Sequence, residues 1–142
     1  MNKNFVLKEF IIFIIFGLMY VTIELLYRGH THYSMFIVGG ICGVLIGLIN
    51  DNTPDMPLLP QCVLGAVIIT IIELLTGLFL NVYLGLNVWD YSNQPFNFMG
   101  QICPQFCIIW CILSILVIRI DDWLKEKVLK THISHLYMEL DI

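Results

Sequence analysis

Long apolar stretches separated by short polar ones dominate the pattern along this chain. Charged residues are absent from residues 10–23, 29–50, 56–72, 74–89 and 91–118. The hydrocarbon core of a bilayer, about 30 Å thick, is crossed by roughly 20 helical residues. Glycine, proline and asparagine between these stretches favour turns. The pattern therefore predicts four membrane-spanning helices, near residues 5–27, 33–50, 61–83 and 97–120.

We expect residues 1–120 to form one all-α domain, an integral membrane four-helix bundle. No small-residue cleavage site follows the first span, so a retained helix is expected there rather than a signal peptide. After Arg119 the apolar residues recur at roughly helical spacing, with lysines on other faces, which is typical of an interfacial helix. Residues 121–142 are therefore expected to form a C-terminal cytoplasmic amphipathic helix.

Composition and charge support a membrane protein and add an orientation. The chain is 58% hydrophobic and 13% charged, with a mean hydropathy of +0.85, far from the balance of a soluble domain. Of the seven lysines and arginines, only Arg28 falls in a loop between spans, and the others flank the two termini. By the positive-inside rule, both termini are expected in the cytoplasm. The lipid bilayer is the expected surrounding, and nothing favours a nucleic-acid partner.

The five cysteines lie within or at the edge of the predicted spans. Cys103, Cys107 and Cys111 recur every four residues and would share one helix face, as the ligands of a soft metal ion would. Small apolar packing is the simpler interpretation of such thiols. We therefore expect no metal site, no cofactor and no disulfide framework.

Short echoes in the sequence indicate an internal duplication. Residues 22–26 (TIELL) are echoed by residues 71–75 (IIELL), and each is followed later by a segment that contains Tyr-Ser and ends in Ile-Cys. The pattern predicts two tandem two-helix repeats related by a pseudo-two-fold axis along the membrane normal. Glu24 and Glu73 would then face each other across that axis.

Two acidic residues of the predicted spans, Glu24 and Glu73, need partners. Glu24 and Arg28 stand four apart with the acid first, the favourable order for an ion pair on one helix. This pair is either structural or part of a site. Glu73 has no basic residue within one helical turn, so it must face protein or a water-filled cavity rather than lipid. It is either a hydrogen-bonded packing residue or a ligand or proton site, with Asn81 near its face.

The loop before the fourth predicted span combines aromatic residues with many polar ones, including Asn97. Trp89 and Tyr91 suit the membrane interface. We expect Asp90 to pair with Arg28 and so to link the two halves of the chain. The alternative is that this loop caps a binding site.

Three glycines of the second predicted span, Gly39, Gly43 and Gly47, stand four apart. Small residues at this spacing let two helices approach closely. We expect this glycine stripe to form the seam with a neighbouring helix or subunit.

Three strings, YRGHTHYSMFIVGGICGVLIGLIN, IELLTGLFLNVYLGLNVWDYS and PFNFMGQIC, resemble the ABC-transporter type IV, or CmpB-like, family of small bacterial membrane proteins. The resemblance covers about residues 22–122 and implies a transport-related role in the bacterial plasma membrane. The family's signature positions map onto Glu24, Tyr27, Arg28, Gly29, His32, Ser34, Glu73, Trp89, Asp90, Tyr91, Ser92, Pro95, Asn97, Gly100 and Gln101. The fourth span departs from the family around Pro104, Cys107 and Cys111, which argues further against a cysteine-based mechanism.

The function expected first is a transporter or permease-like subunit with a polar site between helices. Its candidate ligand or proton residues are Glu24, Glu73, Arg28, Asp90, Asn81 and Gln101, with His32, Trp89, Tyr91 and Asn97 in the outer loops. The chain has no GxxxxGK[ST] motif, so an ATP-driven role needs a separate ATPase subunit. Four helices enclose little space, so a homo-oligomer is expected.

Two other functions remain open from the sequence. One is a non-transporting interaction or scaffold protein that presents the glycine stripe and the outer loop to a partner. The other is a small homo-oligomeric channel or a proton-coupled secondary transporter. An enzyme is not expected, because no nucleophile motif is present and His32 and Ser34, two apart, would lie on different faces of a helix.

Overall fold

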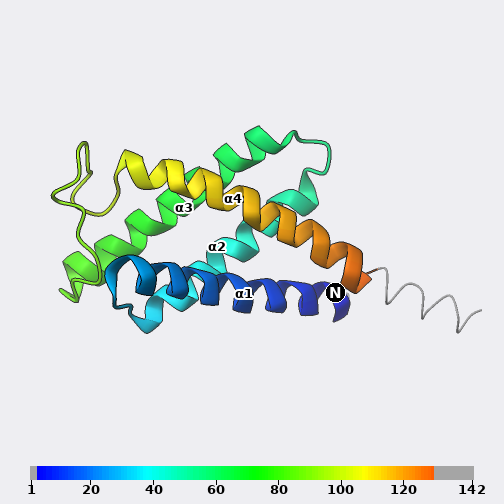
Figure 1. Cartoon of the computed structure of the whole chain (residues 1–142), viewed down its shortest axis with the longest axis horizontal. Helices are drawn as coiled ribbons and strands as arrows, with labels where there is room; N and C mark the ends of the chain where they lie inside the picture. The colour runs from blue at the N-terminus through cyan, green and yellow to red at the C-terminus, as the bar shows by residue number, and fades with distance from the viewer. Residues whose placement is uncertain (1–2, 130–142) are drawn as a thin grey trace, which may run out of the picture.

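Four α-helices run back and forth along the long axis of the described chain, residues 3–129 of a computed structural model (Figure 1). The helices are α1 (Lys3–Arg28), α2 (Tyr33–Asn52), α3 (Leu58–Gly77) and α4 (Pro104–Leu124). A π-helical segment, η1 (Leu78–Tyr83), continues α3, and a second, η2 (Lys125–Leu129), follows α4. The all-α class expected from the sequence is confirmed.

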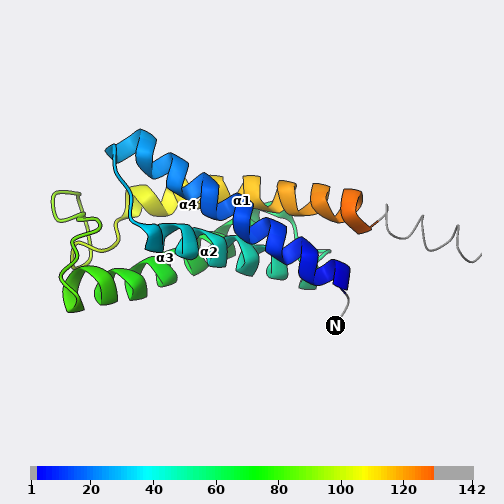
Figure 2. The ribbon, with the colours of Figure 1, turned by 90° about the horizontal axis from the view of Figure 1, so that it is seen from below.

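The two ends of the molecule differ in what they carry. One end, which we call the loop end, holds the end of α1, the start of α2, η1 and residues 84–103, which lead into α4 (Figures 1 and 2). The other, the terminal end, holds the start of α1, the turn between α2 and α3, and the end of α4. Polar residues from distant parts of the sequence meet at each end.

Local sequence explains where most helices begin and end. Gly29 adopts a φ of 75°, the left-handed conformation that commonly follows a helix, and α1 ends one residue before it. His32 is the N-cap of α2, because its Nδ1 atom accepts a hydrogen bond of 3.3 Å from the backbone N–H of Ser34. Pro104 opens α4, at a position where a proline's missing N–H costs nothing.

Two helix boundaries differ from those expected. α3 starts at Leu58 rather than near position 61, because Pro60 falls in the first helical turn and is tolerated there. α4 starts at Pro104 rather than near position 97, because residues 97–103 fold as part of the loop. The Asn97 side chain organises that loop: its Nδ2 atom donates to the Gln94 carbonyl at 2.9 Å, and its Oδ1 atom accepts from the Gly100 N–H at 2.9 Å.

Three described segments are long and apolar enough to cross a membrane: α1, α2, and α3 with η1 as one segment, Leu58–Tyr83. The chain is accordingly a membrane protein. α4 is not among these three; its last two turns carry Arg119, Asp121 and Asp122. Its role as a fourth span stays a prediction.

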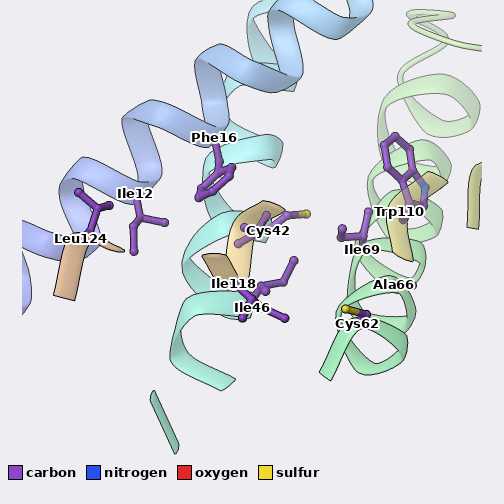
Figure 3. Packing of buried hydrophobic residues seen from close by; sticks show 11 residues of the cluster. Ile12, Phe16, Cys42, Ile46, Cys62, Ala66, Ile69, Trp110, Ile118 and Leu124 are labelled. Carbon is purple, nitrogen blue, oxygen red and sulfur yellow. The ribbon is translucent and has the colours of Figure 1, made fainter. Parts of the chain in front are cut away.

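The core lies where all four helices meet (Figure 3). It contains Ile12 and Phe16 of α1, Cys42 and Ile46 of α2, Cys62, Ala66 and Ile69 of α3, and Trp110, Ile118 and Leu124 of α4. Lipid tails are as apolar as these side chains, so close van der Waals packing rather than water exclusion holds such helices together. All five cysteines are free thiols.

The glycine stripe of α2 lies against α1. A Cβ atom on Gly39 would approach the Tyr20 Cβ to 2.6 Å, and one on Gly43 would approach the Phe16 Cδ2 to 2.5 Å. Gly47, at the end of the stripe, faces Asp121 of α4, with 3.1 Å from its Cβ position to the Asp121 Oδ1. All three glycines of the stripe therefore pack against helices of the same chain.

Gly43→Ala is expected to lower the stability of the fold by about 1–3 kcal/mol, because the added methyl group overpacks the contact with the Phe16 ring. Gly47→Ala is the comparison and should lose less stability, since its new methyl group would come no closer than 3.1 Å to a neighbouring atom, the Asp121 Oδ1. The measurement is the midpoint of thermal unfolding in mild detergent, followed by size-exclusion chromatography. Equal losses for the two variants would contradict the close α1–α2 contact at Gly43.

Two expectations stay open at the level of the fold. Consecutive helices pair, α1 with α2 and α3 with α4, as tandem repeats would require, but this pairing does not test the duplication. Of the expected amphipathic tail, residues 121–124 belong to α4 and residues 125–129 form η2. Residues 130–142 lie outside the described part of the chain.

Candidate functional site

Glu73, near the end of α3, is buried between α3, α4 and the loop that joins them, with 4% of its surface exposed. Its Oε1 atom accepts a hydrogen bond of 2.9 Å from the Tyr91 hydroxyl, and its Oε2 atom accepts one of 2.9 Å from the Trp110 Nε1–H. Both donors are neutral, so among the described residues no cation touches this carboxyl group. Glu73 joins α3 to α4 and to the loop between them.

Aromatic packing sets the positions of these two donors. The Tyr91 ring stacks on Phe106, with 4.6 Å between ring centroids, and the Trp110 ring stacks on Tyr20 at 5.8 Å. Phe106 and Trp110 are one helical turn apart on α4 and contact each other. Sequence reasoning missed Trp110, Phe106 and Tyr20 as parts of the site. A tryptophan in an apolar helix was a usable signal, because its buried N–H needs an acceptor.

Glu24 and Arg28 form the ion pair that their spacing predicts. Glu24 is 5% exposed, and its second oxygen accepts a hydrogen bond of 2.8 Å from the Thr31 hydroxyl. The Arg28 Nη1–H donates to the backbone carbonyl of Val88 at 3.1 Å. Arg28 thus connects the end of α1 to the loop before α4.

The expected ion pair between Asp90 and Arg28 is wrong. Asp90 is exposed, and its Oδ1 atom accepts from the backbone N–H and the hydroxyl of Ser92 instead. These two hydrogen bonds lower the pKa of the Asp90 carboxyl group below its usual range. The physical reason is alternation: Trp89 and Tyr91 on either side point inward, so the side chain between them points outward.

Trp89 and Tyr91, which suit a membrane interface by residue type, are packed inside the protein. Both are buried, and the Trp89 Nε1–H donates to the Gln101 carbonyl at 3.1 Å. A Cβ atom on Gly77 would come within 2.9 Å of the Trp89 Cζ2, so the loop lies directly on α3 there. The two rings pack the loop against the ends of α3 and α4.

Asn81 and Gln101 fasten this loop to the end of α3. The Asn81 Nδ2–H donates to the Gln101 Oε1 at 2.8 Å, and the Asn81 Oδ1 accepts from the Val88 N–H at 2.7 Å. Asn81 lies in η1, and short π-helical segments of this kind often occur at functional sites. Both residues hold the loop in position over Glu73.

Asn81→Leu is expected to loosen the loop, because the Val88 N–H and the Gln101 Oε1 both lose a partner, at about 1–3 kcal/mol each. The readout is the rate of proteolytic cleavage between residues 84 and 103 in detergent. Asn93→Leu, at an exposed position of the same loop, is the control and should leave the rate unchanged. Equal rates in both variants would refute the fastening role of Asn81.

His32 and Ser34 lie closer together than expected. The His32 Nδ1 is 2.7 Å from the Ser34 Oγ, because His32 precedes α2 in an extended conformation and does not belong to the helix. The expectation that their side chains point apart is wrong. Their contact belongs to the cap of α2.

Two adjoining cavities lie beside the Glu24–Arg28 pair. The inner cavity, of about 110 Å³, lies between α1 and α4 and is lined by Tyr20, Ile23, Glu24, Tyr27, Arg28, Tyr91, Phe106, Ile109 and Trp110. The outer cavity, of about 280 Å³, is lined by Asp90, Gln94 and other loop residues. Four residues, Tyr27, Arg28, Tyr91 and Phe106, belong to both linings, so the cavities adjoin.

A second polar group, which we call the terminal-end cluster, was missed entirely by sequence reasoning. Lys8 is 1% exposed and Asp121 is fully buried. The Lys8 Nζ is 2.6 Å from the Asp51 Oδ2 and 3.1 Å from the Asp121 Oδ1. The Lys125 Nζ is 2.5 Å from the Asp51 Oδ1 and 3.0 Å from the Asp121 Oδ2. The cluster joins α1, α2, α4 and η2.

Three carboxylates of this cluster, those of Glu9, Asp51 and Asp121, have the spacing of metal ligands. The Lys8 Nζ lies within 3.1 Å of an oxygen of each of them. The lysine ammonium group therefore already stands where a bound cation would be. In the sequence, Lys8 had contributed only to the orientation of the chain, although a lysine inside an apolar helix indicates a buried counter-charge.

Because of the terminal-end cluster, the stability of the fold should fall as the pH becomes strongly alkaline. Burial alone lowers the pKa of Lys125, but its hydrogen bonds to Asp51 and Asp121 outweigh burial and raise the pKa above 10.5. A folded-state pKa above the unfolded value means that Lys125 stabilises the fold fully below about pH 10.5 and loses this effect as pH rises through its folded pKa.

The measurement is the thermal midpoint as a function of pH for the wild type and Lys125→Arg. Arginine stays charged throughout this range, so the variant should lose less stability above about pH 10.5 than the wild type. Identical alkaline profiles would show that Lys125 contributes nothing that depends on its charge.

Comparison with known proteins gives one match. A family model described as Putative ABC-transporter type IV matches residues 4–140. No curated protein and no solved structure matches the chain.

Proposed function

Because this chain belongs to the family described as Putative ABC-transporter type IV, we propose that it is a transporter or permease-like subunit of the bacterial plasma membrane. Its ligand or proton site would lie at the loop end, between α1, α3 and α4. Glu73 would be the central residue, with Tyr91 and Trp110 as its donors. Glu24 and Arg28 would form the adjoining charged pair.

One observation carries this proposal. Glu73 is buried among neutral donors in a segment able to cross a membrane, and those donors also line the cavity that contains the Glu24–Arg28 pair. A carboxyl group at such a depth is costly and commonly belongs to an ion, proton or substrate pathway. A packing role alone does not account for the adjoining cavities, which a packed interior would fill.

In the proposed topology α4 is the fourth span and both termini lie in the cytoplasm. The terminal end, with Lys3, Lys8 and Lys125, would face the cytoplasm, and the loop end would face outward. The outer cavity would then open to the outside of the cell. The proposed tandem duplication fits this topology, because two two-helix repeats would enter the membrane from the same side.

The energy source of this proposed transporter distinguishes two versions of it. With no nucleotide-binding motif of its own, the chain would need a separate ATPase subunit, and otherwise it would act as a homo-oligomeric channel or proton-coupled secondary transporter. Cross-linking in the native host, purification in mild detergent and mass spectrometry would separate them. A stoichiometric ATPase supports the subunit version, whereas the protein alone contradicts it.

Glu73→Gln tests the site directly. The amide keeps the shape of the side chain but removes the charge, so proton movement into vesicles or coupled uptake is expected to stop while size-exclusion profiles stay those of the wild type. Asp55→Asn, at an exposed turn position, is the control for a lost carboxylate. Unchanged activity in Glu73→Gln would refute the site, and loss of assembly in that variant would assign Glu73 a structural role.

The scaffold alternative has less support. It relied on the glycine stripe as a surface for a partner, and that stripe packs on α1 and α4 of the same chain. The outer loop is likewise held inward by Trp89 and Tyr91 rather than extended toward a partner.

A further inference from the structure

We propose that the inner cavity between α1 and α4 binds an alkylated ammonium group, which makes a small organic cation the substrate class of this protein. The inference deepens the proposed function and rests on it for the transport step, although binding itself can be measured without transport. Three features carry the proposal: the aromatic walls of the cavity, the charges around it, and its connection to the outer cavity.

Aromatic rings form most of the cavity wall. Five of the nine lining residues are aromatic: Tyr20, Tyr27, Tyr91, Phe106 and Trp110. Phe106 lies at the centre of this group, 4.6 Å from the Tyr91 ring centroid and 5.9 Å from those of Tyr27 and Trp110. Aromatic rings that line a cavity attract alkylated ammonium groups through their electron-rich faces.

Hydrogen bonding strengthens this attraction at two of the rings. Tyr91 and Trp110 donate their O–H and N–H to the Glu73 carboxyl group. A phenol or indole that donates to an anion gains electron density on its ring, because the hydrogen-bonded groups polarise one another. When Glu73 is ionised, it thus acts on the cavity through the two rings that donate to it, and it would favour a positively charged guest.

The charges around the cavity also favour a cation. The Arg28 guanidinium is neutralised by Glu24 and further occupied by the Val88 carbonyl. An ionised Glu73 leaves the site with one negative charge in excess. A free anion would therefore meet repulsion, while a hard metal cation would find too few oxygen ligands in a mostly aromatic wall.

Size and access fit a group larger than water. The inner cavity measures about 110 Å³, whereas one water molecule takes about 30 Å³. The adjoining outer cavity of about 280 Å³ carries Asp90 and Gln94 in its wall. An organic cation entering from the loop end would meet the Asp90 carboxylate first and the aromatic wall next.

The test is calorimetric titration of the full-length protein in detergent with choline, and with the neutral isostere of choline that has carbon in place of the quaternary nitrogen. We expect choline to bind at least about 10-fold more tightly than the isostere, since the two differ only in charge. Equal affinities, or no binding of choline, would overturn the proposal.

Phe106→Leu is expected to weaken choline binding by roughly 2- to 30-fold, the range for loss of one cation–π contact. Phe79→Leu is the matched control, because Phe79 is exposed and contacts only the Tyr83 ring among the described aromatic residues. If Phe106→Leu does not fold, Tyr91→Phe keeps the ring and removes its hydrogen bond to Glu73, so a smaller loss is expected. Wild-type affinity for choline in Phe106→Leu and in Tyr91→Phe, wherever these variants fold, would overturn the assignment.

A quaternary ammonium group can come from a free solute or from a phosphatidylcholine headgroup. Nanodiscs with and without phosphatidylcholine distinguish the two sources: a headgroup in the cavity would compete with free choline, whereas a free-solute site would bind choline equally in both. Choline binding without uptake into vesicles would refute the transport function and leave this inference intact. Uptake or proton movement that depends on Glu73, without choline binding, would support the transport function and refute this inference.

Discussion

Lys8→Met is expected to lower the stability of the fold by about 3–5 kcal/mol, the usual cost of breaking a buried ion pair by removing one partner. The Lys8 ammonium group lies between Glu9, Asp51 and Asp121, and Asp121 is fully buried. Without Lys8, Asp51 and Asp121 keep their ion pairs with Lys125, but Glu9 loses the ammonium group that it contacts. The measurement is the thermal midpoint in detergent together with the fraction recovered as a monodisperse species.

Lys3→Met is the control for this prediction, because it removes the same charge from an exposed position of the same helix. Its effect should stay within about 0.5 kcal/mol. The double variant Lys8→Met, Asp121→Asn should regain part of the loss, since one uncompensated charge is removed with its partner. A Lys8→Met protein as stable as Lys3→Met would show that the terminal-end cluster does not hold the helices together.

Arg28→Met should lower stability by about 2–3 kcal/mol, because Glu24 stays buried without its cation and the Val88 carbonyl loses a donor. The loss is smaller than for Lys8, since the Arg28 side chain is 20% exposed and water can reach Glu24 after the substitution. The same thermal measurement applies. Faster cleavage of the loop before α4 should accompany it, as this arginine joins that loop to α1.

Arg28→Lys and Arg119→Met complete this test. The lysine keeps the charge but cannot reach Glu24 and the Val88 carbonyl with the same planar fork, so an intermediate loss is expected. Arg119 is exposed and forms no ion pair within residues 3–129, so its replacement should change little. A loss in Arg119→Met equal to that in Arg28→Met would mean that the effect reflects net charge rather than this site.

Much of the candidate site was visible in the sequence, and the reason is local geometry. The Glu24–Arg28 pair follows from a spacing of four on one helix, which brings two side chains together whatever the rest of the chain does. The depth of Glu73 follows from the charge-free stretches around it. The glycine stripe follows from the same periodicity, and it lies in a helix contact, as small residues at that spacing favour.

Other parts of the site could not be read from sequence, because contacts between distant segments decide them. Lys8 and Asp121 are far apart in the chain and meet only because the start of α1 and the end of α4 lie at the same end of the molecule. Asp90 was expected to find Arg28. The loop instead turns its two aromatic neighbours inward, so the carboxylate points to solvent and binds Ser92.

Hydrophobic pattern and residue spacing alone decide that this chain is an all-α membrane protein, roughly where its helices lie, and that Glu24 and Glu73 need partners. Such properties depend on neighbours within a few residues and on the cost of a charge in lipid. The tertiary structure alone decides which partners these residues have. The indole of Trp110 reaches Glu73 only because α3 packs on α4, and the loop folded back over both helices brings the Tyr91 hydroxyl to the same carboxyl group.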